Sequence, residues 1–257
     1  MIHVRNLSFA YNGGFRLEDV SFHLRPAQLT ALVGPNGSGK STLLKLLAGI
    51  LSPTGGEIAA GEDRPSPSRP HSWARRVAWL PQEMDAPPGA LVEDTVRLGL
   101  FPRSKSWGWR LPKDSEERLD RALRLFDLIE FRRKSLARLS GGERRRVLLA
   151  RAFVQGAEAF LLDEPAAHLD PRRNAEVMDV LIHLRREQGI LVLMATHDVN
   201  LALGFADRVL LLSAGRLVAD GPPVAVLSPA GLERAYGLPA RPAPGIGFFI
   251  SSKENQP

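Results

Sequence analysis

A glycine-rich loop near the amino terminus carries the clearest chemistry in the sequence. Residues 34–41 are Gly-Pro-Asn-Gly-Ser-Gly-Lys-Ser and fit the pattern G-x-x-x-x-G-K-[ST]. In loops of this pattern, backbone N–H groups surround the phosphates of a nucleotide, the lysine reaches the outer phosphates and the final hydroxyl binds Mg²⁺. We therefore predict that Lys40 contacts phosphate and that Ser41 is a ligand of Mg²⁺.

The segments on either side of this loop match what a phosphate site needs. Residues 28–33 form a short apolar run that predicts a buried strand, and residues 40–50 predict a helix whose leucines face inward. A strand, a glycine-rich loop and a helix in this order favour a phosphate site over a plain glycine turn.

Two adjacent carboxylates, Asp163 and Glu164, follow an apolar run at 159–162. Parallel sheets bind ligands at the carboxyl ends of their strands, so these two acids are expected to lie beside the nucleotide. Asp163 would then contact Mg²⁺ through water, and Glu164 would polarise the attacking water. Taken alone, the segment also fits a strand followed by a polar turn that caps a helix.

His197 stands at a comparable position, directly after the apolar run 191–195 and Thr196. At the carboxyl end of a strand in the same sheet, its imidazole could touch the γ-phosphate and sense the loss of that group. The alternative is an ordinary hydrogen-bonding histidine on the surface.

A second helix start follows the phosphate loop much later in the chain. Leu139 and Ser140 precede Gly141, Gly142 and Glu143, which lead into a basic helical run. Backbone N–H groups at such a start suit a second anion, although one nucleotide hardly needs two sites of this kind. The alternative is a capping box, in which Ser140 caps the helix and Glu143 answers it three residues later.

Composition narrows the class of protein. The chain has 257 residues, enough for one large domain, and its lack of cysteine excludes disulfides and thiolate metal sites. Its net charge of +6 invites a nucleic-acid interpretation, best supported by the runs 132–134 and 144–146. We expect no nucleic-acid partner, because no basic surface interleaved with aromatics is evident and such runs are typical of solvated helix faces.

The order of predicted elements indicates an α/β fold. Residues 2–9 and 16–24 alternate around Asn12-Gly13-Gly14 as a β-hairpin, 61–72 form an exposed loop, and 77–80 form a strand. Residues 83–155 have helical character, with helices predicted at 92–100 and 115–129 and after Gly142. Strands and helices then alternate at 160–162, 171–187, 190–194, 199–205 and 208–212, which predicts a mainly parallel sheet.

The predicted organisation is one unit of 1–257. It comprises an α/β core of 1–82 and 156–238, an inserted helical subdomain of 83–155 and a tail of 239–257 with an edge strand at 246–250. The start, Met1 to Arg5, resembles a strand rather than a secretory leader, and no apolar stretch approaches the roughly 20 residues of a membrane span.

The ordered set of motifs resembles the nucleotide-binding subunit of the ATP-binding cassette (ABC) family. The residues that carry this resemblance are Gly34 to Ser41, Gln82, Leu139 to Glu143, Leu162 to Pro165, Leu169-Asp170 and His197. It implies a P-loop NTPase core, mainly a parallel sheet with helices, with an amino-terminal antiparallel β subdomain and an inserted α-helical subdomain. It also implies an ATPase that uses ATP and Mg²⁺.

The resemblance implies a role for each matching residue. Nucleotide-binding positions would be Tyr11, which stacks on adenine, with Asn36, Gly37, Ser38, Gly39, Lys40, Ser41, Thr42, Ser140, Gly141, Gly142 and Asp170. Metal positions would be Ser41, Gln82 and Asp163, and catalytic positions Glu164, His197 and Gln82. The intact lysine, acids and histidine argue against a module that has lost hydrolysis.

The resemblance also implies partners. Two copies would form a head-to-tail homodimer at the cytoplasmic face of the membrane, with integral permease subunits and an extracytoplasmic substrate-binding protein. The segment Leu139 to Arg144, with 196–202 and 235–237, is similar to the ATPases that import ferric siderophores, haem or cobalamin. The alternative is a non-transport or export-linked soluble cassette ATPase, for example one of iron–sulfur assembly.

Overall fold

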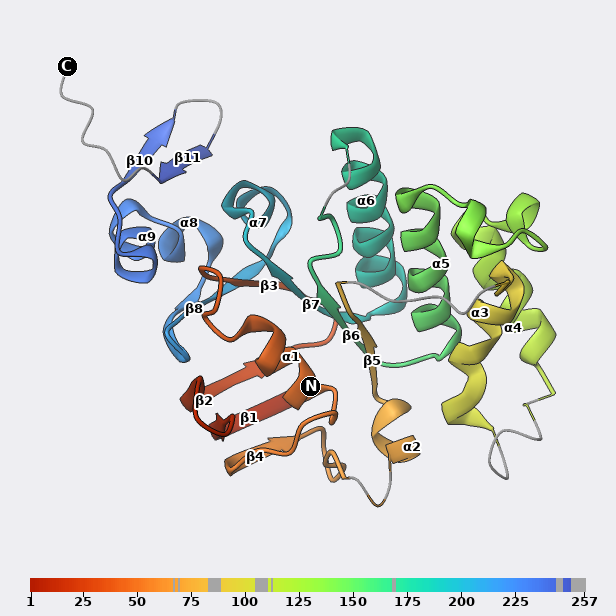
Figure 1. Ribbon diagram of the computed structural model, residues 1–257, viewed down its shortest axis with the longest axis horizontal. Coiled ribbons are helices and arrows are strands. Elements are labelled where there is room, and N and C mark those ends of the chain that lie inside the picture. The colour runs from red at the N-terminus through yellow and green to blue at the C-terminus, as the bar shows by residue number, and fades with distance from the viewer. Residues whose placement is uncertain are drawn as a thin grey trace.

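The computed structural model describes the chain except for residues 67, 69, 83–88, 105–110, 112, 168–169, 244–246 and 251–257. Its elements are shown in Figure 1. The strands are β1 (Ile2–Ala10), β2 (Arg16–Leu24), β3 (Leu29–Val33), β4 (Gly55–Ala59), β5 (Val77–Leu80), β6 (Ala159–Asp163), β7 (Leu191–Thr196), β8 (Arg208–Ser213), β9 (Arg216–Gly221), β10 (Ala240–Ala243) and β11 (Gly247–Ile250).

Helices occupy most of the remaining described chain. The α-helices are α1 (Lys40–Leu47), α2 (Pro70–Ala74), α3 (Val92–Arg97), α4 (Ser115–Leu125), α5 (Gly141–Val154), α6 (Pro171–Gln188), α7 (Val199–Phe205), α8 (Pro223–Val226) and α9 (Pro229–Tyr236). Three 3₁₀ turns are also present among the described residues: η1 (Leu98–Arg103), η2 (Ile129–Phe131) and η3 (Leu136–Arg138). None of the described helices combines the length and apolar character of a membrane span.

The central sheet has the strand order β5-β6-β7-β3-β8-β9. Neighbouring strands from β5 to β8 are parallel, and β9 is antiparallel to β8. The hairpin of β1 and β2 is extended by β4 into a separate antiparallel sheet of order β2-β1-β4. The strands β6, β7 and β3 therefore end side by side, and their carboxyl ends carry the segments predicted to do chemistry.

Alternation along the strands divides the core between two faces of the central sheet. On one face, Leu161 and Leu193 pack with the leucines of α1 and with residues of the antiparallel sheet, so α1 lies between the two sheets (Figure 1). On the other face, Phe160 and Leu162 pack with α5 and α6. This two-sided burial explains why the central strands are continuous apolar runs.

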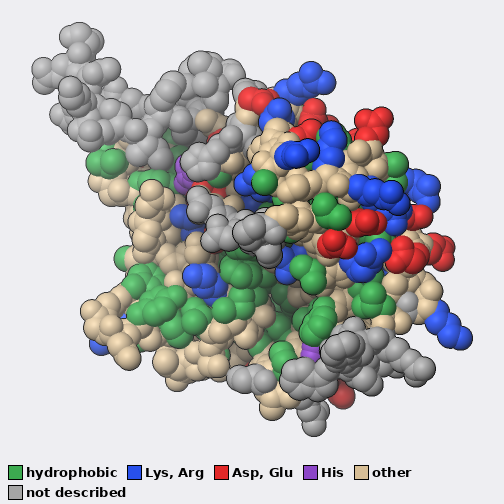
Figure 2. Space-filling model, turned by 45° about the vertical axis from the view of Figure 1, so that its right-hand side comes forward, with side chains coloured by type: hydrophobic (Ala, Val, Ile, Leu, Met, Phe, Trp, Pro, Cys, Tyr) green, Lys and Arg blue, Asp and Glu red, His purple; other side chains and the backbone are tan. Residues whose placement is uncertain are grey.

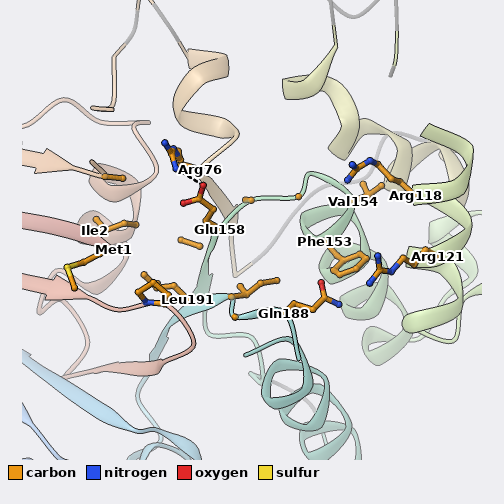
Figure 3. Close-up of a pocket in the computed structure, with 17 residues that line it drawn as sticks. Met1, Ile2, Arg76, Arg118, Arg121, Phe153, Val154, Glu158, Gln188 and Leu191 are labelled. Atoms are coloured by element: carbon orange, nitrogen blue, oxygen red, sulfur yellow. Dashed lines mark hydrogen bonds and ion pairs between the residues drawn. The ribbon is translucent and has the colours of Figure 1, made fainter. Parts of the chain in front are cut away.

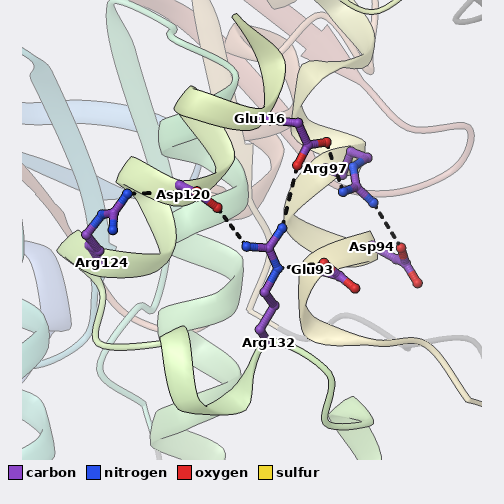
Figure 4. A network of polar contacts seen from close by, with 7 residues as sticks. All are labelled: Glu93, Asp94, Arg97, Glu116, Asp120, Arg124 and Arg132. Carbon is purple, nitrogen blue, oxygen red and sulfur yellow. Dashed lines mark hydrogen bonds and ion pairs between the residues drawn. The ribbon is translucent and has the colours of Figure 1, made fainter.

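The helices α3, α4 and α5 form a cluster at the β5 edge of the sheet (Figure 1). A polar network joins α3 and α4 to the segment after η2, and Arg132 is at its centre (Figure 4). Its guanidinium donates to Glu93 Oε2 and to Asp120 Oδ1, each at a distance of 2.7 Å. The hydrogen bond from Arg132 holds the pKa of Glu93 below its usual range.

Charges of both signs are interspersed over this helical side of the molecule (Figure 2). Arg132 thus forms ion pairs with acids of its own chain, whereas the basic run predicted that it would lie on a fully solvated helix face. An ion-pair network of this kind stabilises more than isolated surface pairs do.

Several element boundaries differ from the sequence-based expectations. The helix predicted at 40–50 ends at Leu47, because the backbone turns to a φ of +74° at Gly49. The helix predicted at 115–129 ends at Leu125, near Asp127 with a φ of +51°. The helix predicted at 92–100 becomes 3₁₀ from Leu98, and Pro102 lies within that turn.

The loop predicted at 61–72 was wrong at its end, where α2 begins. Pro70 suits the first turn of a helix. The indole N–H of Trp73 donates to Leu47 O at a distance of 2.8 Å, and this bond holds α2 against α1. The strands β4, β9 and β10 and the helices α8 and α9 were not predicted. A strand is observed at 247–250, but it pairs with β10 in a separate two-stranded sheet, and Ile246 lies outside the described residues.

Candidate functional site

The glycine-rich loop connects β3 to α1, as its sequence predicts. Gly39 adopts a φ of +106° directly before the helix, a conformation that favours glycine. Lys40 is buried, and its ammonium donates to Gly34 O at 2.7 Å and to Pro35 O at 3.0 Å. Burial lowers the pKa of Lys40, while the nearby carboxylates of Glu164 and Asp163 act in the opposite direction.

Close packing explains why two positions of this loop are glycine. A Cβ at Gly34 would lie 2.0 Å from Leu212 O, and a Cβ at Gly39 would lie 2.4 Å from Phe15 Cζ. Ser38 has a buried hydroxyl with no partner among the described residues. A glycine-rich loop at a helix start with one unsatisfied buried hydroxyl is chemically suited to oxygen-rich anions.

The two acids lie at the carboxyl end of β6. Asp163 is buried and pairs in register with Ala195 of β7. The next residue, Glu164, has a φ of +48°, unusual for a side chain of this size, and its N–H donates to Ala195 O over 3.0 Å. The turn therefore leaves the strand abruptly and directs the two carboxylates differently.

The Asp163 carboxyl is held in an unfavourable environment for charge. Burial raises its pKa, a hydrogen bond with Ser41 lowers it in part, and the neighbouring Glu164 charge raises it further. The hydrogen bond joins the acid to the hydroxyl that follows Lys40, so the two motifs identified separately in the sequence meet in the fold.

Glu164 is also in contact with the other two predicted catalytic residues. Its Oε1 lies 3.0 Å from Nδ1 of His197, and its Oε2 accepts a hydrogen bond of 3.4 Å from the Gln82 amide. The Glu164 side chain is 14% exposed and that of His197 is 61% exposed. The carboxylate is thus enclosed between two polar groups on one side of the site.

A cavity of about 630 Å³ contains these groups together. Its lining residues are Tyr11, Phe15, Asn36, Gly37, Gly39, Lys40, Ser41, Thr42, Gln82, Glu164 and His197. Phe15 was not predicted. The sequence feature that could have indicated it is its position in the hairpin directly after two glycines. The hairpin turn places the Phe15 ring against Gly39 of the phosphate loop. Tyr11 lies beside it, edge-on to Phe9 with ring centroids 4.8 Å apart.

The second helix start forms a different cavity, of about 360 Å³. Ser140, Gly142 and Asp170 line it with several arginines. Glu143 N–H donates to Ser140 Oγ, and Ser140 N–H donates to Glu143 Oε2 over 2.7 Å, so the capping box is present. Asp170 caps α6 by accepting from Arg173 N–H over 3.0 Å. None of the residues that line this second cavity also lines the first.

The predicted nucleotide-binding residues therefore divide into two groups within one chain. Tyr11 and the phosphate loop lie in the first cavity, whereas Ser140, Gly142 and Asp170 lie in the second. Gly141 is exposed at the start of α5. Leu169 lies outside the described residues.

A third cavity, of about 400 Å³, lies at the opposite end of the strands (Figure 3). Ala159 and Leu191, which begin β6 and β7, line it. On one wall of this cavity Phe153 faces Arg121, and on another wall Arg76 forms an ion pair with Glu158. Ligands of parallel sheets bind at the carboxyl ends of the strands, so this cavity is not the candidate site.

The environment of Asp163 predicts a trade-off between stability and chemistry. Its folded pKa is raised above the value of 3.8 for a free carboxyl, so stability falls as the pH rises from about 3.8 through the folded pKa. Asp163→Asn should therefore raise the Tm of the nucleotide-free protein at pH 7 by about 2–4 °C. Scanning calorimetry at several pH values would show the gain shrinking toward pH 4.

Asp198→Asn is the matched control for this prediction. Asp198 caps α7 by accepting hydrogen bonds from the N–H groups of Asn200 and Leu201, each at a distance of 2.9 Å. Asparagine would keep an acceptor oxygen at this position. Its Tm should stay close to that of the wild type. A Tm for Asp163→Asn below the wild-type value at pH 7 would contradict the prediction.

Comparison with known proteins identifies the family. Residues 17–167 match the sequence model described as ABC transporter. The chain is 35% identical to the petrobactin import ATP-binding protein of Bacillus anthracis over 93% of this chain and 87% of that protein. It is 38% identical to the hemin import ATP-binding protein of Bordetella parapertussis over 93% of each.

Solved structures agree with this assignment. A metal-chelate type ABC transporter in an inward-facing conformation matches with a TM-score of 0.84 and 27% identity, over 98% of both chains. The dimeric structure of a bacterial ABC transporter cassette matches with a TM-score of 0.77 and 26% identity, over 87% of this chain and 99% of that one. The predicted fold class is confirmed, and the chain is an ATP-binding ATPase that belongs to the ABC transporter family.

Proposed function

We propose that this chain is the ATPase subunit of an importer that takes up a metal chelate through a separate membrane permease. The observation that carries the proposal is the placement of Glu164 between His197 and Gln82, in the same cavity as the phosphate loop. The similar proteins named above are described as import proteins for petrobactin and hemin, and the similar structure named first is described as of metal-chelate type.

Each residue of the cavity has a distinct part in the proposed reaction. Lys40 neutralises the outer phosphates, and Asn36, Gly37, Ser38, Gly39 and Thr42 belong to the loop and helix start that enclose them. Tyr11 stacks on the adenine ring. Glu164 polarises the attacking water, and His197 contacts the γ-phosphate while holding Glu164 in place.

The donor set beside the loop fits Mg²⁺. The Ser41 hydroxyl, the Asp163 carboxylate and the Gln82 amide offer hard oxygen ligands. Among the described residues no group of three or more His, Cys, Asp or Glu side chains forms a complete metal cage. Sparse protein ligands suit an ion that also binds nucleotide phosphates, where it neutralises charge during phosphoryl transfer.

The separation of the two cavities supports a head-to-tail homodimer. In the proposed dimer each ATP lies between the phosphate loop of one chain and Ser140, Gly141, Gly142 and Asp170 of the other. Each chain then carries two incomplete halves of different sites, and ATP binding closes the pair. Hydrolysis removes the γ-phosphate contacts and reopens it.

We propose the same division of the chain that the sequence suggested. The core, 1–82 and 156–238, binds the nucleotide, and the helical subdomain, 83–155, transmits its state, while 239–257 form a tail. Leu98 and Phe101 are 57% and 42% exposed on the helical side and are candidates for permease contact. Trp107 and Trp109 of the same subdomain are further candidates by their residue type, and they lie outside the described residues.

The proposed assembly stands at the cytoplasmic face of the membrane with permease subunits and an extracytoplasmic substrate-binding protein. Co-expression with a candidate permease, chosen from the polytopic membrane proteins encoded near this chain's gene if any are found there, tests it. We expect the two to purify together and the permease to change the ATPase rate. Proteoliposomes that hold ATP inside and receive the substrate-binding protein with a ferric siderophore, haem or cobalamin from outside then identify the cargo by ATP-dependent uptake.

The rival assignment, a soluble cassette ATPase of another process, predicts a different result. In that case purification would recover only soluble partners, and no permease would alter hydrolysis. That outcome would overturn the importer proposal without affecting the ATPase assignment.

A further inference from the structure

A buried arginine on α5 contacts the two strand ends that carry the proposed catalytic groups. Arg145 is only 7% exposed, and its guanidinium donates to four backbone carbonyls. Nε donates to Pro165 O at 3.0 Å and Nη2 to Asp163 O at 3.0 Å. Nη1 donates to Pro81 O at 3.0 Å and to Gln82 O at 3.3 Å.

The basic run 144–146 was expected to form a solvated helix face, and for Arg145 this was wrong. Its neighbour Arg144 is exposed, with one long described hydrogen bond of 3.4 Å to Leu136 O. Arg145 instead points into the fold from the same helix. No sequence signal marks this difference, because three consecutive arginines look alike until the helix is placed.

The environment of Arg145 is unusual for a cation. Burial lowers the pKa of Arg145 to about 10, and the nearby Asp163 charge opposes that shift. A buried charge is costly unless hydrogen bonds satisfy it. The guanidinium satisfies its charge by donating to carbonyls of two separate segments at once. A lysine ammonium, which has fewer donors and no rigid planar geometry, would fit these carbonyls less well.

The four carbonyls surround the proposed catalytic groups. Asp163 and Pro165 lie immediately before and after Glu164, whose φ of +48° marks a backbone that needs outside support. Pro81 directly follows β5, and Gln82 is the residue whose side-chain amide donates to Glu164 Oε2. One guanidinium therefore fixes the backbone on both sides of the Glu164–Gln82 contact.

We propose that Arg145 is a positioning residue for ATP hydrolysis, holding Glu164 and Gln82 in register from the helix that begins at Ser140 and Gly142. This inference rests on the proposed role of Glu164. Because α5 also begins with the residues proposed to meet the partner's nucleotide, Arg145 links the two half-sites of one chain through a single helix.

Steady-state kinetics of Arg145→Met, with Arg144→Met as matched control, test the proposal. Loss of the guanidinium should lower kcat about 10- to 100-fold, because small misplacements of catalytic groups are costly. KM for ATP should change by no more than about twofold, since the phosphate loop is untouched. Arg145→Lys should restore part of kcat. Wild-type kcat in Arg145→Met, or a rise in KM alone, would overturn the proposal.

A double-mutant cycle separates positioning from general destabilisation. If Arg145 acts through Glu164, adding Arg145→Met to Glu164→Gln should lower the residual hydrolysis little further. Multiplied losses would overturn the proposal. Should Arg145→Met fail to fold by circular dichroism, Arg145→Gln serves in the same cycle. Normal hydrolysis by Glu164→Gln alone would instead reject the role of Glu164 on which the inference rests.

Discussion

Glu164→Gln is expected to lower steady-state ATP hydrolysis by about 10²- to 10⁴-fold, the range for loss of a general base. Glutamine keeps the size of the side chain and its hydrogen-bonding capacity toward Gln82 and His197, but it cannot polarise a water as a carboxylate does. Phosphate release measured at saturating ATP and Mg²⁺ gives the rate directly.

The same variant should accumulate as an ATP-bound dimer. Lys40 and the loop that enclose the phosphates are unchanged, so binding persists while the step that reopens the pair is blocked. Light scattering coupled to size exclusion should report a dimer with ATP and a monomer without it. Direct quantification of bound nucleotide should give two ATP per dimer, as two composite sites require.

Glu158→Gln is the control for this experiment. Glu158 directly precedes β6, at the end of that strand opposite Glu164, and pairs with Arg76 over 2.5 Å at the rim of the third cavity. Its removal should leave hydrolysis nearly unchanged. Normal hydrolysis in Glu164→Gln, or equal losses in both variants, would contradict the role given to Glu164.

Mixed dimers test whether each site is shared between two chains. One chain carries Ser140→Arg and the other Lys40→Ala, and different affinity tags isolate the mixed pair. If the sites are shared, one site contains both lesions and the other neither. One ATP per dimer should remain bound, with about half of the wild-type activity if the sites act independently and none if both must fire.

The complementary pair, a doubly substituted chain with a wild-type chain, serves as the control. Here each shared site carries one lesion, so hydrolysis should fall far below that of the first arrangement or be absent. If each chain formed a complete site alone, the order would reverse, and the doubly substituted pair would keep one intact site. That reversal would reject the head-to-tail dimer.

Local sequence was informative where one segment contains both the signal and its structural cause. The phosphate loop combines its glycines, Lys40 and Ser41 in eight residues, and the buried strands β6 and β7 are unbroken apolar runs. The position of Glu164 and His197 followed from the rule that parallel strands present ligands at their carboxyl ends.

Features that depend on distant packing were not predictable in the same way. Phe15 belongs to the site only because the hairpin brings its ring under Gly39. Arg145 is distinguished from Arg144 by the carbonyls of Pro81, directly after β5, and of Asp163, the last residue of β6. The helix α2 depends on the contact of Trp73 with Leu47, which no local pattern contains.

The hydrogen bonds of Lys40 bear on the energetics of nucleotide exchange. Its ammonium donates to Gly34 O and Pro35 O, so the lysine acts as an internal placeholder that satisfies its own loop. An arriving phosphate must replace at least part of this hydrogen bonding. The free energy of binding therefore gains only the difference between the new hydrogen bond to a charged phosphate oxygen and the lost bonds to two neutral carbonyls. Lys40 therefore joins Gly34 and Pro35 of its own loop, in addition to the part proposed for it with phosphate.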